Sequence, residues 1–310
     1  MSEASPVGRT AGRTRDEAIG GLLVGASSLL FGTVVIFGKF ALRRDLPVTS
    51  ILSIRYAIGA MVLALALVAL RRPLLPVAGE RVGLGVLGMC LYAVESAFFF
   101  SALGHGTAAA VTLLFFTYPV FVTVASWALG HGRPVRLTVL SLASAVSGAG
   151  LVAGSGGGLA VRTAGVLFAL ASAGTYAAYL IGADFVLKKT NPMTSAMWVS
   201  AGAALGLAVY TAVSGGGRLP SGWTEWWPVL GMGVATAGAF VCLMSGIQRL
   251  GAVRTSIVAA TEPLAISFLA FVFLDESVSL GTALGGVLIL AGAVTASFAR
   301  TATVQEQQIP

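Results

Sequence analysis

The feature that most constrains the fold of this chain is a succession of ten apolar runs, each long enough to cross a lipid bilayer. Of the 310 residues, 56% are hydrophobic and only 10% are charged, whereas roughly a quarter are charged in soluble domains. With a helix rise of about 1.5 Å per residue, about twenty apolar residues cross the hydrocarbon layer. The sequence therefore predicts an all-α integral membrane protein with ten transmembrane helices. The runs lie near residues 19–41, 48–70, 82–104, 107–130, 137–153, 163–187, 193–213, 226–249, 252–274 and 280–299.

The distribution of positive charge supports the count of ten. Cytoplasmic loops of membrane proteins are enriched in Lys and Arg. With the N-terminus inside, the outer loops carry only Arg43, Arg44, Arg162 and Arg218. We therefore expect a multi-pass protein of the bacterial plasma membrane with cytoplasmic tails at residues 1–18 and 300–310. The thirteen basic residues on the inner side are Arg9, Arg13, Arg15, Arg71, Arg72, Arg81, Arg133, Arg136, Lys188, Lys189, Arg249, Arg254 and Arg300.

An internal repeat divides the chain into two halves. Thr117-Tyr118-Pro119 matches Thr261-Glu262-Pro263 at a spacing of 144 residues, and the register holds without a gap from Ser101/Ser245 to Gly148/Gly292. Near the front of each half, a spacing of 145 pairs Pro47 with Pro192 and Ser27 with Ser172. Five membrane crossings per half is an odd number, so the halves, residues 19–155 and 163–299, enter the membrane from opposite sides. The sequence predicts two inverted five-helix repeats.

The Glu262-Pro263 pair lies near the middle of the apolar stretch 255–274. Ionisable side chains at that depth face a protein interior or a watery cavity. Proline lacks an N–H and displaces the carbonyl four residues earlier, here that of Ala259. A broken helix present twice, at Pro119 and Pro263, is typical of the binding site of a transporter.

Glu95 and Glu262 are the deepest acids in the predicted spans, and Arg55 lies some seven residues into the second. For Glu262 two roles stay open: a ligand or proton site in a cavity, or a structural pairing with Arg55 or with a freed backbone N–H. Tyr and Trp side chains at mid-membrane depth need hydrogen-bond partners, which makes several of them cavity candidates. The predicted substrate-binding residues are Tyr118, Trp198, Glu95, Glu262, Tyr92, Tyr176, Tyr179 and Arg55, with Pro119 and Pro263 as helix breaks.

Other function classes fit poorly. The basic residues form no stripe of the kind that binds nucleic acid. There is no H-E-x-x-H motif, no Walker glycine loop and no histidine after His131, and Cys90 and Cys242 fall inside apolar runs. No repeated polar filter of a channel is visible. We expect no enzyme activity, no cofactor and no metal; the lipid bilayer and a small-molecule substrate are the expected partners of a monomer.

The motifs that carry a family resemblance are Phe31-Gly32 with Lys39, Arg55-Tyr56-Ala57, Thr107-Ala108-Ala109-Ala110 with Pro119, Glu262-Pro263, Asp275-Glu276, and Gly285 through Gly292. On these motifs the chain resembles, over about residues 19–299, the EamA family of the drug/metabolite transporter superfamily. One departure is His131-Gly132, where the first half of family members often has an acidic turn.

The resemblance implies a ten-helix carrier with two inverted repeats that exports small metabolites, amino acids among them, by alternating access. The mid-membrane aromatics point to its exporters of aromatic or hydrophobic amino acids. Two alternatives stay open: a proton-coupled efflux carrier for drugs or nucleoside-type metabolites, and a polytopic membrane enzyme.

Overall fold

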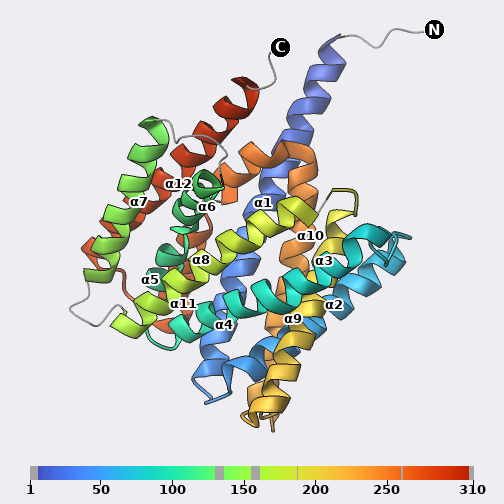
Figure 1. Cartoon of the computed structure of the whole chain (residues 1–310), viewed down its shortest axis with the longest axis vertical. Coiled ribbons are helices and arrows are strands. Elements are labelled where there is room, and N and C mark those ends of the chain that lie inside the picture. Colours follow the sequence, from blue (N-terminus) through green and yellow to red (C-terminus); the bar gives the residue numbers. More distant parts are fainter. Residues whose placement is uncertain (1–5, 130–135, 155–160, 187, 260, 307–310) are drawn as a thin grey trace.

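The computed structural model describes residues 6–129, 136–154, 161–186, 188–259 and 261–306, and the regular elements within these ranges are all helical (Figure 1). The third predicted span is built from four consecutive pieces: η1 (Ala78–Glu80), α3 (Arg81–Val86), η2 (Leu87–Tyr92) and α4 (Ala93–Leu103). The other helices are α1 (Pro6–Leu42), α2 (Val48–Ala69), α5 (Ala108–Phe115), α6 (Tyr118–Ala128), α7 (Arg136–Gly154), α8 (Thr163–Val186), α9 (Pro192–Ser214), α10 (Trp223–Ala259), α11 (Glu262–Leu274) and α12 (Leu280–Glu306).

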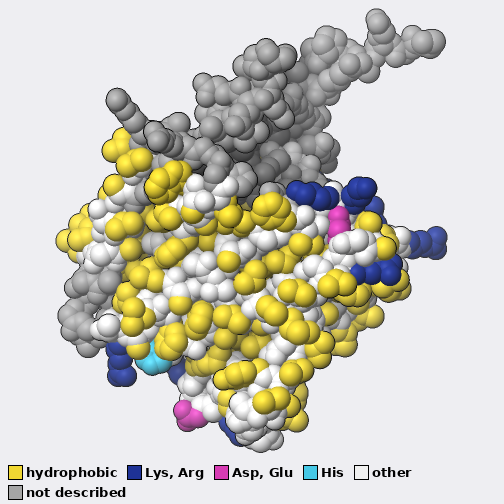
Figure 2. Space-filling view, in the orientation of Figure 1, with side chains coloured by type: hydrophobic (Ala, Val, Ile, Leu, Met, Phe, Trp, Pro, Cys, Tyr) yellow, Lys and Arg dark blue, Asp and Glu magenta, His cyan; other side chains and the backbone are white. Residues whose placement is uncertain are grey.

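In the part of the chain that the structure describes, six helical stretches are long and apolar enough to cross a membrane. Four shorter apolar helices, Ala108–Val122, Val139–Val152, Glu262–Leu274 and Leu280–Gly292, lie where the remaining spans are predicted. Figure 2 shows a broad band of hydrophobic side chains with the Lys and Arg side chains at its edges. Exposed apolar surface on this scale requires a nonpolar surrounding, so the fold is that of an integral membrane protein.

The third predicted span contains a π-helical turn, η2, that the sequence analysis does not predict. Gly88 in this turn lies directly against the backbone of Val199 in α9, and Gly202 of α9 lies against Gly85. Small residues permit such close approach of two membrane helices. Because a π turn inserts an extra residue into the helix, it changes the direction of the side chains that follow, beginning with Tyr92 at its end.

The eighth and ninth predicted spans join without a loop. The prediction placed a connection near residues 250–251, but α10 continues as helix to Ala259, and Figure 1 shows its last turns bending away from the rest of the helix. In the first half, Gly104 and Gly106 interrupt the corresponding position. Their counterparts 144 residues later are Gln248 and Leu250, which are much better helix formers than glycine.

Helices of the two halves pack in matched pairs. α1 packs against α10, and their counterparts α8 and α4 also pack together; α1 contacts α11 just as α8 contacts α5 and α6. The contact of α2 with α10 is likewise matched by that of α9 with η2, and two further large contacts join a helix to its own counterpart, α2 to α9 and α7 to α12 (Figure 1). Exchanging the halves therefore preserves the main packing contacts.

α7 and α12 cross at small residues. A Cβ atom on Gly148 would lie 2.5 Å from the Gly285 carbonyl oxygen, and one on Gly292 would lie 2.6 Å from the Ser141 carbonyl oxygen. Since the contacts move toward the start of α7 as they move toward the end of α12, these two counterpart helices run antiparallel. The internal repeat relates the two contacts to each other, because Gly292 follows Gly148, and Gly285 follows Ser141, by 144 residues.

Matching acids hold the connections at the helix ends. Glu80 accepts hydrogen bonds from the backbone N–H groups of Lys188, Lys189 and Thr190 at 2.7–3.0 Å. Its counterpart Glu225, 145 residues later, forms an ion pair with Arg218. Both acids therefore begin the third span of their half and fix a connection between helices.

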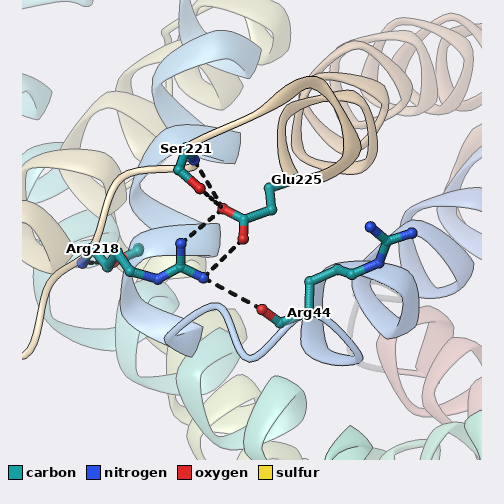
Figure 3. A network of polar contacts seen from close by, with 5 residues as sticks. Arg44, Arg218, Ser221 and Glu225 are labelled. Atoms are coloured by element: carbon teal, nitrogen blue, oxygen red, sulfur yellow. Dashed lines mark hydrogen bonds and ion pairs between the residues drawn. The ribbon is translucent and has the colours of Figure 1, made fainter.

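Figure 3 shows the Glu225 network from close by. The Arg218 guanidinium donates to both Glu225 oxygens at 2.8 and 3.1 Å and to the Arg44 carbonyl oxygen at 3.3 Å. The Ser221 backbone N–H also donates to Glu225, at 2.9 Å. The hydrogen bonds with Glu225 raise the pKa of Arg218 above its ordinary value. The network ties the connection before α10 to the one between α1 and α2.

A second ion pair joins the two halves at the same end of the molecule. Lys39 Nζ lies 3.3 Å from Glu276 Oε1 and also donates to the Gly106 carbonyl oxygen. The other Glu276 oxygen accepts from the backbone N–H of Ala108 at 2.7 Å, at the start of α5. The Glu276 carboxylate therefore joins the last turns of α1 and the start of α5 to the connection between α11 and α12.

Candidate functional site

The first half contains a helix break between α5 and α6. α5 ends at Phe115 and α6 begins at Tyr118. Thr117, between them, has φ −76° and ψ −6°, and its hydroxyl donates to the Leu114 carbonyl oxygen at 2.7 Å. The Thr117 backbone N–H donates to the same oxygen at 3.2 Å. One carbonyl thus receives two hydrogen bonds where the regular helix stops.

The second half repeats this geometry between α10 and α11. Thr261 has φ −78° and ψ −11°, its hydroxyl donates to the Val258 carbonyl oxygen at 2.7 Å, and its backbone N–H donates to the same atom at 3.0 Å. Thr261 and Val258 follow Thr117 and Leu114 by 144 residues. The duplicated helix break expected from the sequence is therefore present, with the same hydrogen bonds in both halves.

Proline explains where the breaks fall. Pro119 and Pro263 are each the second residue of the helix after the break, a position that tolerates proline because its N–H would have no helical partner. Of Pro119 only the backbone is described. A proline cannot donate to the carbonyl four residues before it, which leaves the Phe115 and Ala259 carbonyls without their usual helical bonds.

A ladder of tyrosine rings runs from α2 to the first break. The ring centroids of Tyr56 and Tyr92 are 5.6 Å apart, those of Tyr92 and Tyr179 are 5.1 Å, and those of Tyr179 and Tyr176 are 5.9 Å. Tyr176 meets Tyr118 edge to face at 5.0 Å. The rings come from α2, η2, α8 and α6, so the tyrosine ladder is built from both halves of the chain.

Phenylalanines extend the tyrosine ladder at its Tyr118 end. The Phe115 ring lies 5.6 Å from Tyr118 and 5.2 Å from Tyr176, and Phe99 lies 5.4 Å from Phe115. Within the described residues the hydroxyl groups of Tyr176 and Tyr179 have no hydrogen-bond partner. The site therefore combines a large aromatic wall with polar groups that are available to a ligand.

Glu95 is buried beside the tyrosine ladder and fully engaged. Its side chain is 6% exposed, and its two oxygens accept hydrogen bonds from the hydroxyls of Ser172 and Ser96, each at 2.9 Å. The Tyr56 hydroxyl in turn bonds to the Ser96 hydroxyl. A carboxylate with a hydroxyl on each oxygen is a stable anchor between α4 and α8.

Arg55 lies close to the Glu95 carboxylate but makes no ion pair with it. Its guanidinium carbon is 4.6 Å from the Tyr56 ring centroid and 5.4 Å from that of Phe100. Its Nε donates to the Thr236 hydroxyl of α10 at 3.0 Å. Arg55 therefore joins α2 to the second half of the chain.

Glu262 is the first residue of α11 and is half-buried. Within the part of the chain described, its carboxylate has no hydrogen bond and no ion pair, and it lies close enough to Tyr176 for an electrostatic interaction. The pairing of Glu262 with Arg55, one of its two expected roles, is not found, because Arg55 is held by Thr236 and two aromatic rings.

The structure places Trp198 apart from the other predicted site residues. It lies in the second turn of α9, and its indole N–H donates to the Leu74 carbonyl oxygen at 2.9 Å, in the connection after α2. The sequence analysis assigned it to the same depth as the tyrosines. A position so close to the start of a membrane helix puts the ring near the membrane surface instead.

Several residues of the site were not among the predicted substrate-binding residues: Tyr56, Ser96, Ser172, Thr236 and Phe115. Ser172 had a signal, since it is the repeat counterpart of Ser27, whose hydroxyl donates to the Ala239 carbonyl oxygen at 2.9 Å. Ala239 follows Glu95 by 144 residues. The two serines therefore bind at equivalent places, and only the first half has a carboxylate there.

The fold and the site define a multi-pass membrane protein whose two halves each contain a broken helix beside an aromatic and charged site. A sequence model of the EamA-like transporter family matches the chain twice, over residues 18–154 and 163–298. The chain belongs to this family. Membership indicates a membrane transporter rather than an enzyme.

Individual relatives agree with this assignment. An uncharacterized transporter of Archaeoglobus fulgidus is 28% identical over 87% of this chain and 93% of its own length. An uncharacterized transporter of Synechocystis is 29% identical over 66% of this chain and 62% of its own length. A solved crystal structure superposes with a TM-score of 0.58 at 21% identity, covering 92% of this chain and 99% of the other, and supports the fold.

Proposed function

We propose that this protein exports small metabolites, with amino acids as the leading substrate class, through a site between its two broken helices. The observation that carries the proposal is the tyrosine ladder, which draws on both halves and lies next to two charged groups, Arg55 and Glu262, that form no ion pair among the described residues. A solute with an apolar or aromatic body and charged ends fits such a wall.

The proposed architecture is ten transmembrane helices in two inverted repeats. Its support is the antiparallel crossing of α7 with its counterpart α12, since repeats of inverted topology place counterpart helices in opposite directions. The thirteen-to-four distribution of positive charge favours cytoplasmic positions for both termini. Reporter fusions at Ser2 and Pro310 test this: both should report the cytoplasmic side, and one terminus outside would contradict the inverted repeat.

Alternating access is the mechanism that we propose for this arrangement. The ion pair between Lys39 and Glu276 joins the two halves at the end of α1, and we expect it to separate when the site opens on that side. Rocking one half against the other around a fixed site is the general mode of inverted-repeat carriers. We propose that the protein works in this way as a monomer, with Gly148 and Gly285 used for packing within the chain rather than between chains.

The test is a flux assay with purified protein in proteoliposomes. A panel of labelled amino acids and nucleosides is offered, and protein-free liposomes give the background. We expect saturable flux of one or more amino acids, with aromatic ones among the fastest. Flux of nucleosides alone would contradict the substrate class, and no flux of any solute would contradict the transport proposal for this panel.

Proton coupling is a second candidate, and the unpaired state of Glu262 favours it. A buried carboxylate without a cationic partner is more easily protonated than one held in an ion pair. In the same liposomes, flux that follows an imposed pH gradient in the wild type and loses this dependence in Glu262→Gln would establish coupling. Flux that is independent of the gradient in both proteins would establish uncoupled export.

A further inference from the structure

We infer that Arg55 binds a carboxylate of the transported solute, so that the substrates are small monocarboxylic acids with an apolar or aromatic body. This inference rests on the proposed transport function and specifies the substrate class of the same site. Arg55 is only 5% exposed. Its position between α2 and α10 places it where the two halves meet.

The orientation of the Arg55 side chain is fixed by three groups. The Nε–H donates to Thr236 Oγ1 at 3.0 Å, and Thr236 is itself held because its hydroxyl donates to the Met232 carbonyl oxygen at 2.7 Å. The guanidinium also lies over the rings of Tyr56 and Phe100. Stacking of this kind orients a guanidinium without occupying its terminal nitrogens.

The two terminal nitrogens of Arg55 have no hydrogen bond to any residue that the structure describes. The enclosed polar side-chain atoms without a partner, in the same part of the chain, are Thr112 Oγ1 and Ser200 Oγ. The terminal nitrogens of Arg55 are not among them, so they are not fully enclosed by the described protein atoms. A guanidinium that is buried on its other sides and accessible at its two terminal nitrogens can receive a ligand there.

The protein does not neutralise this charge by direct contact. Glu95 is near enough to interact electrostatically with Arg55, but its oxygens accept from Ser96 and Ser172, and the two side chains form no ion pair. A buried charge without an opposite charge bonded to it is unfavourable. The Thr236 hydroxyl and the two rings offset part of that cost for Arg55, and an anionic ligand on the terminal nitrogens would offset more of it.

The chemistry of the anion follows from the surroundings. The planar guanidinium fork matches the two oxygens of a carboxylate. Tyr56 and Tyr92 begin the tyrosine ladder directly beside it, so the rest of the ligand meets aromatic rings. The rings offer no cation to a second anionic group, which favours monocarboxylates over dicarboxylates.

The inference is tested by equilibrium binding of labelled L-phenylalanine to purified protein in detergent. Two competitors each keep one charged end of phenylalanine: 3-phenylpropionate has the carboxylate and phenethylamine has the amine. In the wild type, 3-phenylpropionate should compete at least tenfold better than phenethylamine. Failure of L-phenylalanine to bind, or better competition by phenethylamine, would overturn the inference.

Substitutions test whether Arg55 is the residue that binds the carboxylate. Arg55→Gln should weaken binding of 3-phenylpropionate at least tenfold, and Arg55→Lys should restore only part of it because a lysine offers no fork. Arg72→Gln, at an exposed arginine outside the site, should bind like the wild type. Thermal unfolding checks that each variant is folded. Thr236→Val loosens the guanidinium of Arg55 but keeps its charge, and it should weaken binding of 3-phenylpropionate about threefold. Unchanged binding of 3-phenylpropionate to folded Arg55→Gln would overturn the inference.

The result is separable from that of the flux assay. Flux of amines or other solutes that lack a carboxylate, without flux of acids, would overturn the role of Arg55 and leave the transport function standing. Absence of flux for the whole panel would count against the transport proposal itself.

Discussion

At the first helix break the chain presents Tyr118, and at the equivalent backbone position of the second break it presents Glu262. The two backbones agree within a few degrees at Thr117 and Thr261, and the same hydroxyl-to-carbonyl bond of 2.7 Å follows in each. The side chains behave differently. The Tyr118 ring packs against Tyr176, whereas Glu262 has no hydrogen bond or ion pair within the described residues.

The two breaks therefore share a backbone structure and differ in the side chain that would contact a solute. Duplication of the helix break gives both halves a freed carbonyl and a helix that begins beside the site. The side chain at the first position of the new helix then gives each half its own role, an aromatic surface in one and a carboxyl group in the other. A solute between the breaks meets an aromatic ring from one half and a carboxyl group from the other.

The largest effect is expected from Glu262→Gln. The substitution keeps the size of the side chain and removes its charge, and the carboxylate supports no other described residue. Flux in proteoliposomes should fall roughly tenfold, which corresponds to about 1.4 kcal/mol, while thermal unfolding in detergent stays close to the wild type. Wild-type flux in a folded Glu262→Gln protein would show that the two breaks do not differ in function.

A smaller effect is expected from Tyr118→Ala. The change removes ring contacts with Phe115, Phe116 and Tyr176, and aromatic pairs contribute about 0.5–1.5 kcal/mol each. The KM for an aromatic amino acid should rise roughly fivefold, with less change in Tyr118→Phe. Phe121→Ala, one turn further along α6 at an exposed position, is the matched control and should keep the wild-type KM. Equal effects of the two alanine substitutions would contradict a specific role for Tyr118.

The smallest effects are expected from Thr117→Val and Thr261→Val. Each substitution removes one hydroxyl-to-carbonyl hydrogen bond, whose net contribution is about 0.5–1.5 kcal/mol, and the Leu114 and Val258 carbonyls keep their bonds from backbone N–H groups. Both variants should unfold at slightly lower temperatures and retain flux. Loss of transport in only one of them would mean that the two breaks are not equivalent as scaffold.

Much of the fold was predictable because it follows from short-range rules. Apolar runs of fixed length mark the membrane helices, and the matching of Thr117-Tyr118-Pro119 with Thr261-Glu262-Pro263 located both helix breaks. The sequence analysis placed a connection near residues 250–251 and so missed the continuation of α10 to Ala259. Gln248 and Leu250 in place of two glycines were the available signal.

The candidate site was predictable in composition more than in geometry. The tyrosines of α6, α8 and η2 were identified from their depth in the membrane, and the structure brings their rings together. The hydroxyl partners of Glu95 come from residue 96 and from α8, a pairing that depends on tertiary packing. The hydrogen bond of the Trp198 indole with the Leu74 carbonyl also depends on tertiary packing, and the π turn η2 has no signature in sequence periodicity.

The central claim is that a solute site lies between the two helix breaks, and substrate protection of an engineered cysteine tests it most directly. In a background with Cys90 and Cys242 replaced by alanine, Tyr118→Cys is treated with a small hydrophilic thiol reagent, with and without a transported solute. Trp198→Cys and Phe121→Cys are the comparison sites. Tyr118→Cys should react, and solute should slow its reaction, whereas solute should not protect Trp198→Cys and Phe121→Cys should stay nearly inert in the lipid. An inert Tyr118→Cys in folded protein, or a reaction that solute does not slow, would contradict the claim.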